Sequence, residues 1–258
     1  MSAQYDNIGT AYDEMKKFPV ALLERANVKT ALAPYIKGAN VLDLACGTGY
    51  YCQKCLEWGA ARVTGVDISK TMIAAAQKAT ADDARVSFQV ADCSVPIRHD
   101  GGPFDIVLGS WLLNYASCRE EMVRMHLNIA MNLKDGGRFI GVTPDPTDDP
   151  KTRIEEVLAA DPPPHPDVTV TVKSEIQDGV ETHLVARTKA GEVEFDGYML
   201  RKAVYEESAR QGGMLGPLMW KPTNMPEKLE DRPYGLDEKA WEAYMKLPHF
   251  CILDLSKN

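Results

Sequence analysis

The stretch Val41-Leu-Asp-Leu-Ala-Cys-Gly-Thr-Gly-Tyr50 decides the fold, because a short apolar run ends there in a glycine-rich turn and a helical pattern follows. A strand that runs directly into glycines and then into a helix lets backbone approach a ligand with no Cβ in the way. The segment therefore predicts a turn that binds a nucleotide or nucleoside at the carboxyl end of a strand.

On both sides of this turn, short apolar runs alternate with longer helical patterns, which is typical of repeated βαβ units and a parallel sheet. Residues 9–36 carry spaced apolar positions that predict an N-terminal helical arm. The expected fold class is α/β, with a Rossmann-like doubly wound sheet of about seven strands. The strands predicted in this half are 40–44, 62–66, 86–90, 104–109 and 137–142, and the helices are about 50–58, 70–80 and 119–133.

The pattern changes after Pro144, where closely spaced prolines and aspartates predict loops and not a helix or a central strand. Three alternating runs follow, separated by short turn signals, and they predict an antiparallel β insertion after the fifth strand. The strands of this insertion are expected at 168–176, 182–188 and 193–198.

The last part of the chain is expected to complete the core sheet with two strands, at 218–221 and 250–255. A helix at about 200–211 should end at Gly212-Gly213, with the first glycine in the left-handed conformation. The predicted division is a cofactor-binding core with its N-terminal arm at 1–144, an inserted substrate lid at 145–200, and the C-terminal completion of the core at 201–258.

Composition and charge narrow the class of partner. The formal net charge is -8, and lysines and arginines form no concentrated run such as nucleic-acid binding requires. No apolar stretch approaches the ~20 residues that cross a bilayer, and the N-terminus has no apolar segment typical of a signal peptide. We therefore expect a cytoplasmic protein with a small-molecule partner, no nucleic acid and no membrane, and the oligomeric state is left open.

The acids around the turn distinguish between the ligands that such a turn can bind. A dinucleotide site requires Gly-x-Gly-x-x-Gly, but Gly47-Thr-Gly49 is followed by no third glycine. Asp43 would repel a pyrophosphate but suits a ligand with an ammonium and a sulfonium. Asp67 ends the second strand, where an acid meets ribose hydroxyls, and Asp92 ends the third, where it could accept from an adenine amine. The pattern favours S-adenosylmethionine over NAD.

These residues resemble the motifs of class I S-adenosylmethionine-dependent methyltransferases. Over about residues 5–145 the chain is similar to the small-molecule branch that contains ubiquinone/menaquinone and toxoflavin-type methyltransferases. The resemblance implies S-adenosyl-L-methionine as cofactor and S-adenosyl-L-homocysteine as product, with Ala45 where glycine is commoner. With Ser110 added from the end of the fourth strand, the expected cofactor-binding residues are Tyr12, Asp43, Ala45, Gly47, Gly49, Asp67, Ile68, Met72, Asp92, Cys93 and Ser110.

The acceptor side is marked mainly by aromatic residues. Tyr5 lies in the same arm as Tyr12, and the resemblance implies an aromatic hydroxyl from this arm near the methyl group. Trp111 follows a strand end at the expected cleft and is the favoured contact for the acceptor. The expected substrate-binding residues are Tyr5, Trp111, Tyr115 and Tyr198.

No catalytic residue is assigned. His165 and His183 lie in the insertion and either could serve as a base. No His or Cys set has the spacing of a zinc site, so no metal is expected. Cys52-x-x-Cys55 is interpreted as helix packing and not as a redox pair.

The expected function is methyl transfer from S-adenosylmethionine to an O, N or S atom of a small molecule, such as a secondary metabolite. This in-line displacement mainly requires alignment of nucleophile, methyl and sulfur, under a lid that excludes water. The alternatives are a nucleotide-dependent oxidoreductase and a non-catalytic protein that retains the cofactor pocket. A protein or RNA methyltransferase is disfavoured, because residues 110–113 are not an Asn/Asp-Pro-Pro-Tyr-type tetrapeptide.

Overall fold

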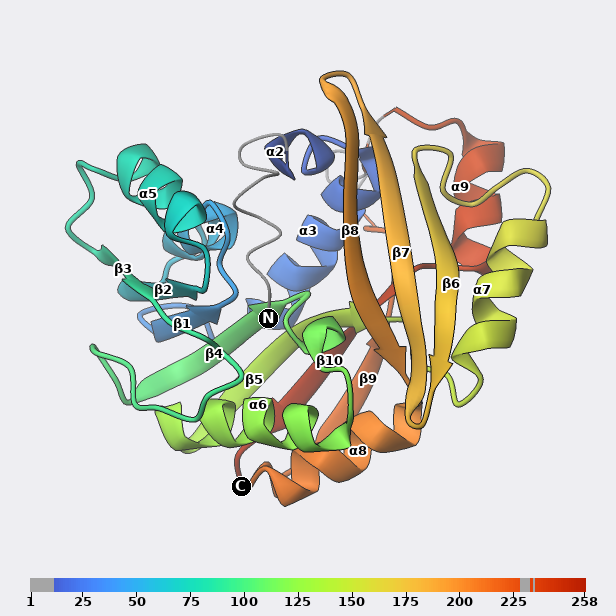
Figure 1. The fold of residues 1–258 in the computed structure, drawn as a ribbon. Helices are drawn as coiled ribbons and strands as arrows, with labels where there is room; N and C mark the ends of the chain where they lie inside the picture. Colours follow the sequence, from blue (N-terminus) through green and yellow to red (C-terminus); the bar gives the residue numbers. More distant parts are fainter. Residues whose placement is uncertain (1–11, 228–232, 234) are drawn as a thin grey trace.

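The computed structural model describes residues 12–227, 233 and 235–258 (Figure 1). Every helix and strand predicted before residue 145 is present, with bounds shifted by a few residues. The helices are α2 Tyr12–Met15, α3 Pro19–Leu32, α4 Tyr50–Glu57, α5 Lys70–Ala79, η2 Leu113–Tyr115, α6 Arg119–Asn132, α7 Pro150–Ala159, α8 Lys202–Gln211 and α9 Glu238–Lys246. The strands are β1 Asn40–Leu44, β2 Arg62–Asp67, β3 Val86–Val90, β4 Phe104–Ser110, β5 Leu133–Pro144, β6 Val168–Ile176, β7 Gly179–Thr188, β8 Gly191–Leu200, β9 Leu218–Pro222 and β10 Phe250–Ser256.

One seven-stranded sheet occupies the centre of the molecule, in the order β3-β2-β1-β4-β5-β10-β9. β1 pairs in parallel with β2 on one side and with β4 on the other, so the strand order reverses between β1 and β4. β10 runs antiparallel to both of its neighbours. The fold is a Rossmann-like α/β sheet, in which ligands bind outside the carboxyl ends of the strands at the reversal point. A ligand is therefore expected at the ends of β1 and β4.

Helices cover both faces of this sheet. Helices α3 and α4 lie on one face and α6 and α8 lie on the other (Figure 1), and their buried side chains belong to two hydrophobic clusters. β10 is buried over its whole length, which explains its nearly continuous apolar run. Its buried Asp254 is compensated by ion pairs with Arg138 and Lys221. Of the helices described, none is long and apolar enough to cross a membrane.

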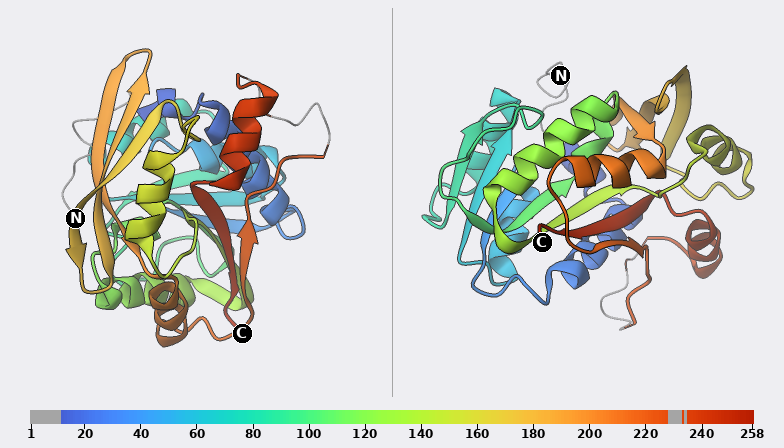
Figure 2. Two further views of the ribbon diagram at one scale, coloured as in Figure 1. Left: turned by 90° about the vertical axis from the view of Figure 1, so that its right-hand side faces the viewer. Right: turned by 90° about the horizontal axis from the view of Figure 1, so that it is seen from below.

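The predicted β insertion forms a separate antiparallel sheet, β6-β7-β8, beside the central sheet (Figure 2). β7 begins at Gly179, three residues before the predicted start at 182. The two connections of the insertion lie side by side, because Lys202 N donates to Thr147 O at 2.8 Å and Ala203 N donates to Asp148 Oδ1 at 2.9 Å. The insertion thus leaves and re-enters the core at one place.

Two helices occur where the sequence analysis predicts no helix. α7 begins at Pro150, and its N-cap Asp149 accepts a hydrogen bond from Thr152 N at 3.1 Å. A proline breaks the interior of a helix, but at the first turn its missing N–H costs nothing. α9 is capped in the same way, since Asp237 accepts from Ala240 N at 2.8 Å. The aspartate before each helix is a typical N-cap residue and is the sequence signal for both helices.

α8 ends differently from the prediction. Gly212 has a φ of -80°, and it is Gly213 that has the left-handed value, 87°, so the assignment to the first glycine was wrong. Gly212 is instead required by packing, because a Cβ there would lie 2.3 Å from His126 Cβ on α6. The first glycine therefore lets α8 approach α6, and the second provides the turn.

Candidate cofactor and acceptor site

The glycine-rich turn between β1 and α4 leaves open space beside its backbone. Ala45, Gly47 and Gly49 have positive φ values of 61°, 55° and 80°. Among the described residues, a Cβ on Gly47 would meet no atom within 4 Å, whereas one on Gly49 would lie 3.1 Å from Ala76 Cβ. Gly47 therefore borders a hollow where a ligand can approach backbone, and Gly49 allows close packing of the helix. The left-handed φ of Ala45 explains why a glycine suits its position.

Asp67 fixes the turn from the end of β2. Its Oδ2 accepts from Gly47 N at 2.8 Å, and its Oδ1 accepts from Ser69 N at 2.9 Å. Each carboxylate oxygen has a second lone pair, so the group can hold the turn and still accept from a ribose hydroxyl. Ile68 is half-buried beside it, but Met72 is only 1% exposed. The structure thus gives Met72 almost no free surface for an adenine.

The end of β3 carries the next two predicted residues. Asp92 is half-buried, and its Oδ1 accepts from Ser94 N at 2.8 Å and from Ser94 Oγ at 2.7 Å. Cys93 is buried, and its Sγ lies 4.0 Å from Val66 O inside the core. Burial raises the pKa of the Cys93 thiol, which is therefore unreactive. Because this side chain points into the core, only the backbone of Cys93 is available to read an adenine edge.

Asp43 is an almost completely buried carboxyl group behind the turn. Desolvation raises its pKa to about 7, although a hydrogen bond from Cys52 and the charge of Lys16 both lower it. Cys52 Sγ donates to Asp43 Oδ2 at 3.2 Å. The Cys52 thiol therefore does more than pack in the helix interface. It donates a hydrogen bond to one oxygen of Asp43, the acid that the sequence assigns to the cofactor. Cys55, the other cysteine of Cys52-x-x-Cys55, is also fully buried.

β4 ends at Ser110, beside the end of β1. The Oγ of Ser110 is buried and has no hydrogen-bond partner among the residues that the structure describes. Leaving a buried hydroxyl unpaired costs ~1–3 kcal/mol, and a bound ligand can supply the partner. This unpaired hydroxyl, the hollow at Gly47 and the acid Asp67 together fit a cofactor with ribose hydroxyls and a charged amino-acid end.

An apolar cavity of about 380 Å³ lies between the end of β4 and the β6-β7-β8 sheet. Its size falls within the ~300–1,000 Å³ typical of small-molecule sites. No residue of the turn 45–49 lines it, so it is a separate space that meets the cofactor end of the sheet at Trp111. The apolar lining includes Phe18, Val20, Ala21, Trp111, Tyr115, Ile154, Val157, Val170, Leu184 and Phe195.

Glu24 of α3 is a buried acid in the wall of this cavity that the sequence analysis does not identify. It accepts from Tyr51 Oη at 2.6 Å and from Trp111 Nε1 at 2.8 Å, and Lys16 Nζ lies 3.7 Å away. Trp111 itself has a left-handed φ of 62°. The signal was present, because Glu24 lies four residues before Val28 on the buried face of α3. Glu24 thus fixes the orientation of the indole that separates cavity and cofactor turn.

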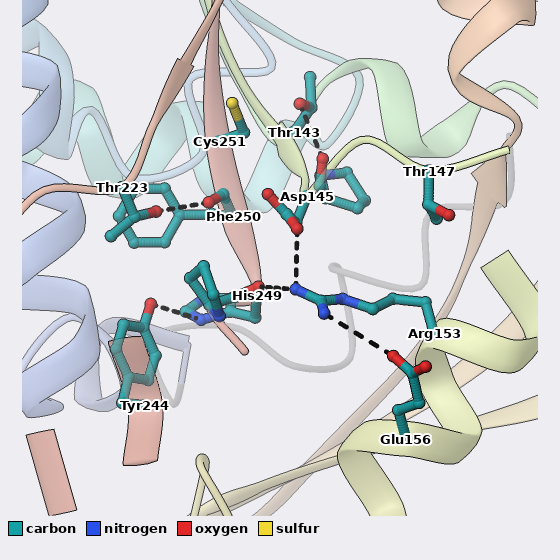
Figure 3. Close-up of polar contacts among 12 residues, drawn as sticks. Thr143, Asp145, Thr147, Arg153, Glu156, Thr223, Tyr244, His249, Phe250 and Cys251 are labelled. Atoms are coloured by element: carbon teal, nitrogen blue, oxygen red, sulfur yellow. Dashed lines mark hydrogen bonds and ion pairs between the residues drawn. The ribbon is translucent and has the colours of Figure 1, made fainter. Parts of the chain in front are cut away.

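Two polar groups of the cavity wall come from α7 and from the residues just before β10 (Figure 3). Arg153 of α7 pairs with Asp145, with Nη2 and Oδ2 2.8 Å apart, and it also donates to Pro248 O. Burial raises the pKa of Asp145 against the opposing effect of Arg153. His249 stacks parallel on Trp111, with ring centroids 5.7 Å apart, and its Nδ1 lies 3.0 Å from Tyr244 Oη.

The two histidines of the insertion lie on different sides of it. His165 lines the cavity and packs edge-on against Tyr244 and His249, with ring centroids 5.0 and 4.7 Å away. His183 lies between Thr182 and Leu184, which line the cavity, so its side chain faces outward. There it pairs with Asp196 at 2.8 Å. Of the two, only His165 can meet a bound acceptor.

The predicted tyrosines fall into three groups. Tyr115 lines the cavity, and burial raises its pKa. Tyr198 lies at the rim, because it contributes to the lining while its cross-strand neighbour Glu181 pairs with Lys173 outside. Tyr12 begins α2, but its side chain, like the whole of Tyr5, lies outside the described residues.

Comparison with known proteins gives the same assignment for the core. Residues 41–137 match the family model of a methyltransferase domain. A solved S-adenosylmethionine-dependent methyltransferase from Listeria monocytogenes is 20% identical, with a TM-score of 0.58 over 93% of this chain and 98% of that one. Residues 41–137 are therefore similar to a methyltransferase domain, and the fold is that of solved S-adenosylmethionine-dependent methyltransferases. An amino pentose methyltransferase from Micromonospora echinaspora, solved with its cofactor bound, shares the fold at 15% identity, with a TM-score of 0.55 over 96% of this chain and 95% of that one.

Relatives in sequence resemble mainly this methyltransferase domain. The demethylmenaquinone methyltransferase of Clavibacter sepedonicus is 32% identical over 147 residues, which cover 54% of this chain and 56% of that protein. The mRNA cap guanine-N(7) methyltransferase of Saccharomyces cerevisiae is 35% identical over 121 residues, or 42% of this chain and 28% of that protein. The chain thus spans little more than half of the first relative and less than a third of the second. Two relatives with such different acceptors do not identify the acceptor of this chain.

Proposed function

We propose that the protein transfers a methyl group from S-adenosylmethionine to an oxygen, nitrogen or sulfur atom of a small-molecule acceptor, such as a secondary metabolite. The observation that carries this proposal is the apolar cavity of about 380 Å³, which begins at Trp111, next to the cofactor end of β4. Its size suits a small molecule. The net charge of -8 opposes a polyanionic acceptor such as RNA.

S-adenosylmethionine supplies a methyl group on a sulfonium, whose departure needs no protonation. The work of the chain is therefore to bind and align its ligands and to exclude water. Asp67 and Ser110 would hold the cofactor, with the buried carboxyl group of Asp43 behind them. Trp111, fixed by Glu24, would form the boundary between the two ligands. The sheet of the insertion would act as the lid over the acceptor.

Titration calorimetry of the purified protein with S-adenosylhomocysteine tests the cofactor half of the proposal. We expect saturable binding that S-adenosylmethionine competes away and NADH does not. Absence of binding would contradict the proposal, and competition by NADH would favour the oxidoreductase alternative.

Transfer itself is tested by incubating the protein and methyl-labelled S-adenosylmethionine with fractionated metabolites. The expected result is a product heavier by one labelled methyl group. Cofactor binding without transfer to any fraction would support the non-catalytic alternative. Label found in RNA and not in small molecules would transfer the assignment to a nucleic-acid acceptor.

A further inference from the structure

The charged groups on the described wall of the acceptor cavity are already paired with one another. Lys16 lies 3.7 Å from Glu24, and Arg153 lies 2.8 Å from Asp145. All four residues line the cavity, and in both pairs the side chains are mostly buried. A charged acceptor would lose its hydration on entering and find no unpaired counter-charge among them. The wall therefore favours an uncharged acceptor.

The two histidines of the cavity add no charge to this wall. Burial lowers the pKa of His249 to about 4, and burial together with the neighbouring His249 and Arg153 lowers the pKa of His165 to about 2. Both imidazoles are therefore neutral near pH 7. A neutral imidazole can donate through one nitrogen and accept through the other.

Three polar atoms of the cavity residues are buried without a hydrogen-bond partner in the described part of the chain. They are Oδ1 of Asn114 and both ring nitrogens of His165, whose ring approaches the backbone of Leu247 without reaching hydrogen-bond geometry. The amide oxygen can only accept, so it requires an N–H or O–H from a ligand. Each unpaired group costs ~1–3 kcal/mol in the empty protein, and a ligand that pairs them recovers this cost on binding.

The remaining wall is suited to a flat molecule. Trp111 and His249 stack with their planes only 2° apart, and Phe195 and Tyr115 add further ring surface to the lining. Aromatic walls pack best against rings, by stacking or by edge-to-face contact.

We infer that the acceptor is an uncharged ring compound that bears an N–H or O–H group, hydrogen-bonded by Asn114 and His165. This inference rests on the proposed function and specifies its substrate class. Asn114 and His165 are then acceptor-binding residues, one from η2 and one from the insertion. A single ligand that bridges them also ties the insertion to the core.

Three naphthalene derivatives of similar shape test the charge selection: 2-naphthol, 2-naphthoate and the 2-naphthylmethylammonium ion. Each is titrated by fluorescence into protein saturated with S-adenosylhomocysteine. We expect 2-naphthol to bind at least about tenfold more tightly than either ion. A charged probe that binds as tightly as 2-naphthol overturns the inference, and so does failure of 2-naphthol to bind.

Two variants test the hydrogen bonds, with naphthalene as a reference ligand that has no hydroxyl. His165→Phe and Asn114→Ala should each weaken 2-naphthol about three- to tenfold and leave naphthalene unchanged, which is the fold-change expected for one hydrogen bond. His183→Phe, on the outer face of the β6-β7-β8 sheet, is the matched control and should change neither affinity. Unchanged 2-naphthol binding in both cavity variants overturns the inference.

Binding of S-adenosylhomocysteine to every variant shows that the variant is folded. It also separates failure of the proposed function from failure of the substrate class. If the wild-type protein fails to bind S-adenosylhomocysteine, the proposed function fails. If it binds this product but shows neither the charge selection nor the loss in the two variants, only the substrate class fails.

Discussion

The cofactor half and the acceptor half of the site are built in different ways. The cofactor half consists of one continuous segment, residues 41–50, and of acids at the ends of neighbouring strands. The acceptor half is assembled from side chains of α3, α7, the insertion and the start of β10, which are far apart in the chain. Local sequence therefore determines the first half, and tertiary packing determines the second. Substitutions should separate the two halves by which ligand they affect.

The largest expected effect concerns Asp43, the buried acid of the cofactor half. Its folded-state pKa of about 7 lies above the unfolded value of 3.8, so the folded state retains the proton longer. The free energy of unfolding is thus undiminished below pH ~4 and falls as the pH rises to 7, by at most about 4 kcal/mol at ~1.36 kcal/mol per unit. Asp43→Asn should lack this fall.

Urea unfolding of the wild type and Asp43→Asn at pH 4, 5.5 and 7 measures the difference. The variant should gain stability relative to the wild type as the pH rises across this range. Parallel pH profiles would show that Asp43 titrates at an ordinary pKa in the folded protein and is not desolvated.

The next effect concerns Asp67, which should act on the cofactor alone. Asp67→Ala removes the acceptor for Gly47 N and the proposed acceptor for the ribose, so we expect about 30- to 100-fold weaker binding of S-adenosylhomocysteine by calorimetry. Asp82→Ala, an exposed acid nearby in the chain, is the control and should bind normally. If Asp67→Ala weakened the acceptor probe but not the cofactor, the division into halves would be wrong.

A smaller effect concerns Glu24, which should act on the acceptor half. Glu24→Gln keeps one acceptor oxygen but loses the charge that faces Lys16, so about 1–2 kcal/mol of stability should be lost. Acceptor-probe affinity should fall while S-adenosylhomocysteine affinity stays within about twofold, because the glycine turn is untouched. Glu57→Gln, on the exposed side of α4, serves as control. An equal loss of both ligands would mean that the halves are coupled through Trp111.

The smallest effect concerns His183. Its hydrogen bond with Asp196 is partly exposed, and such contacts contribute ~0–1 kcal/mol. His183→Gln should therefore leave methyl transfer and both affinities unchanged within about twofold. A large loss of transfer rate in this variant would restore His183 as a candidate base.

The fold and the cofactor turn could be predicted from sequence because their signals are local. Asp43, Gly47 and Asp67 are marked by their positions at strand ends, and the βαβ pattern places those ends at one edge of the sheet. The prediction misses α7 because the closely spaced prolines indicate loops, although Pro150 occupies the one turn of a helix that tolerates proline. It also misses α9, whose capping Asp237 it does not treat as a helix start.

The acceptor side could not be predicted in the same way. Glu24, Asn114 and His249 meet only after α3, β4 and β10 have packed, and no spacing in the chain relates them. His165 and His183 are equivalent in sequence, and only the structure separates them, because His165 lies before β6 and lines the cavity whereas His183 lies on the outer face of β7. The contact between Asp43 and Cys52 likewise requires α4 to fold back on β1.

The paired ends of the insertion have a consequence for how this protein could have diversified. Because Thr147 and Lys202 are hydrogen-bonded neighbours, residues of the insertion that do not pack on the core could change in number or kind while the two ends of the insertion stay together. Changes confined to these residues would alter which acceptor binds. The proposed cofactor site on the central sheet would stay unchanged.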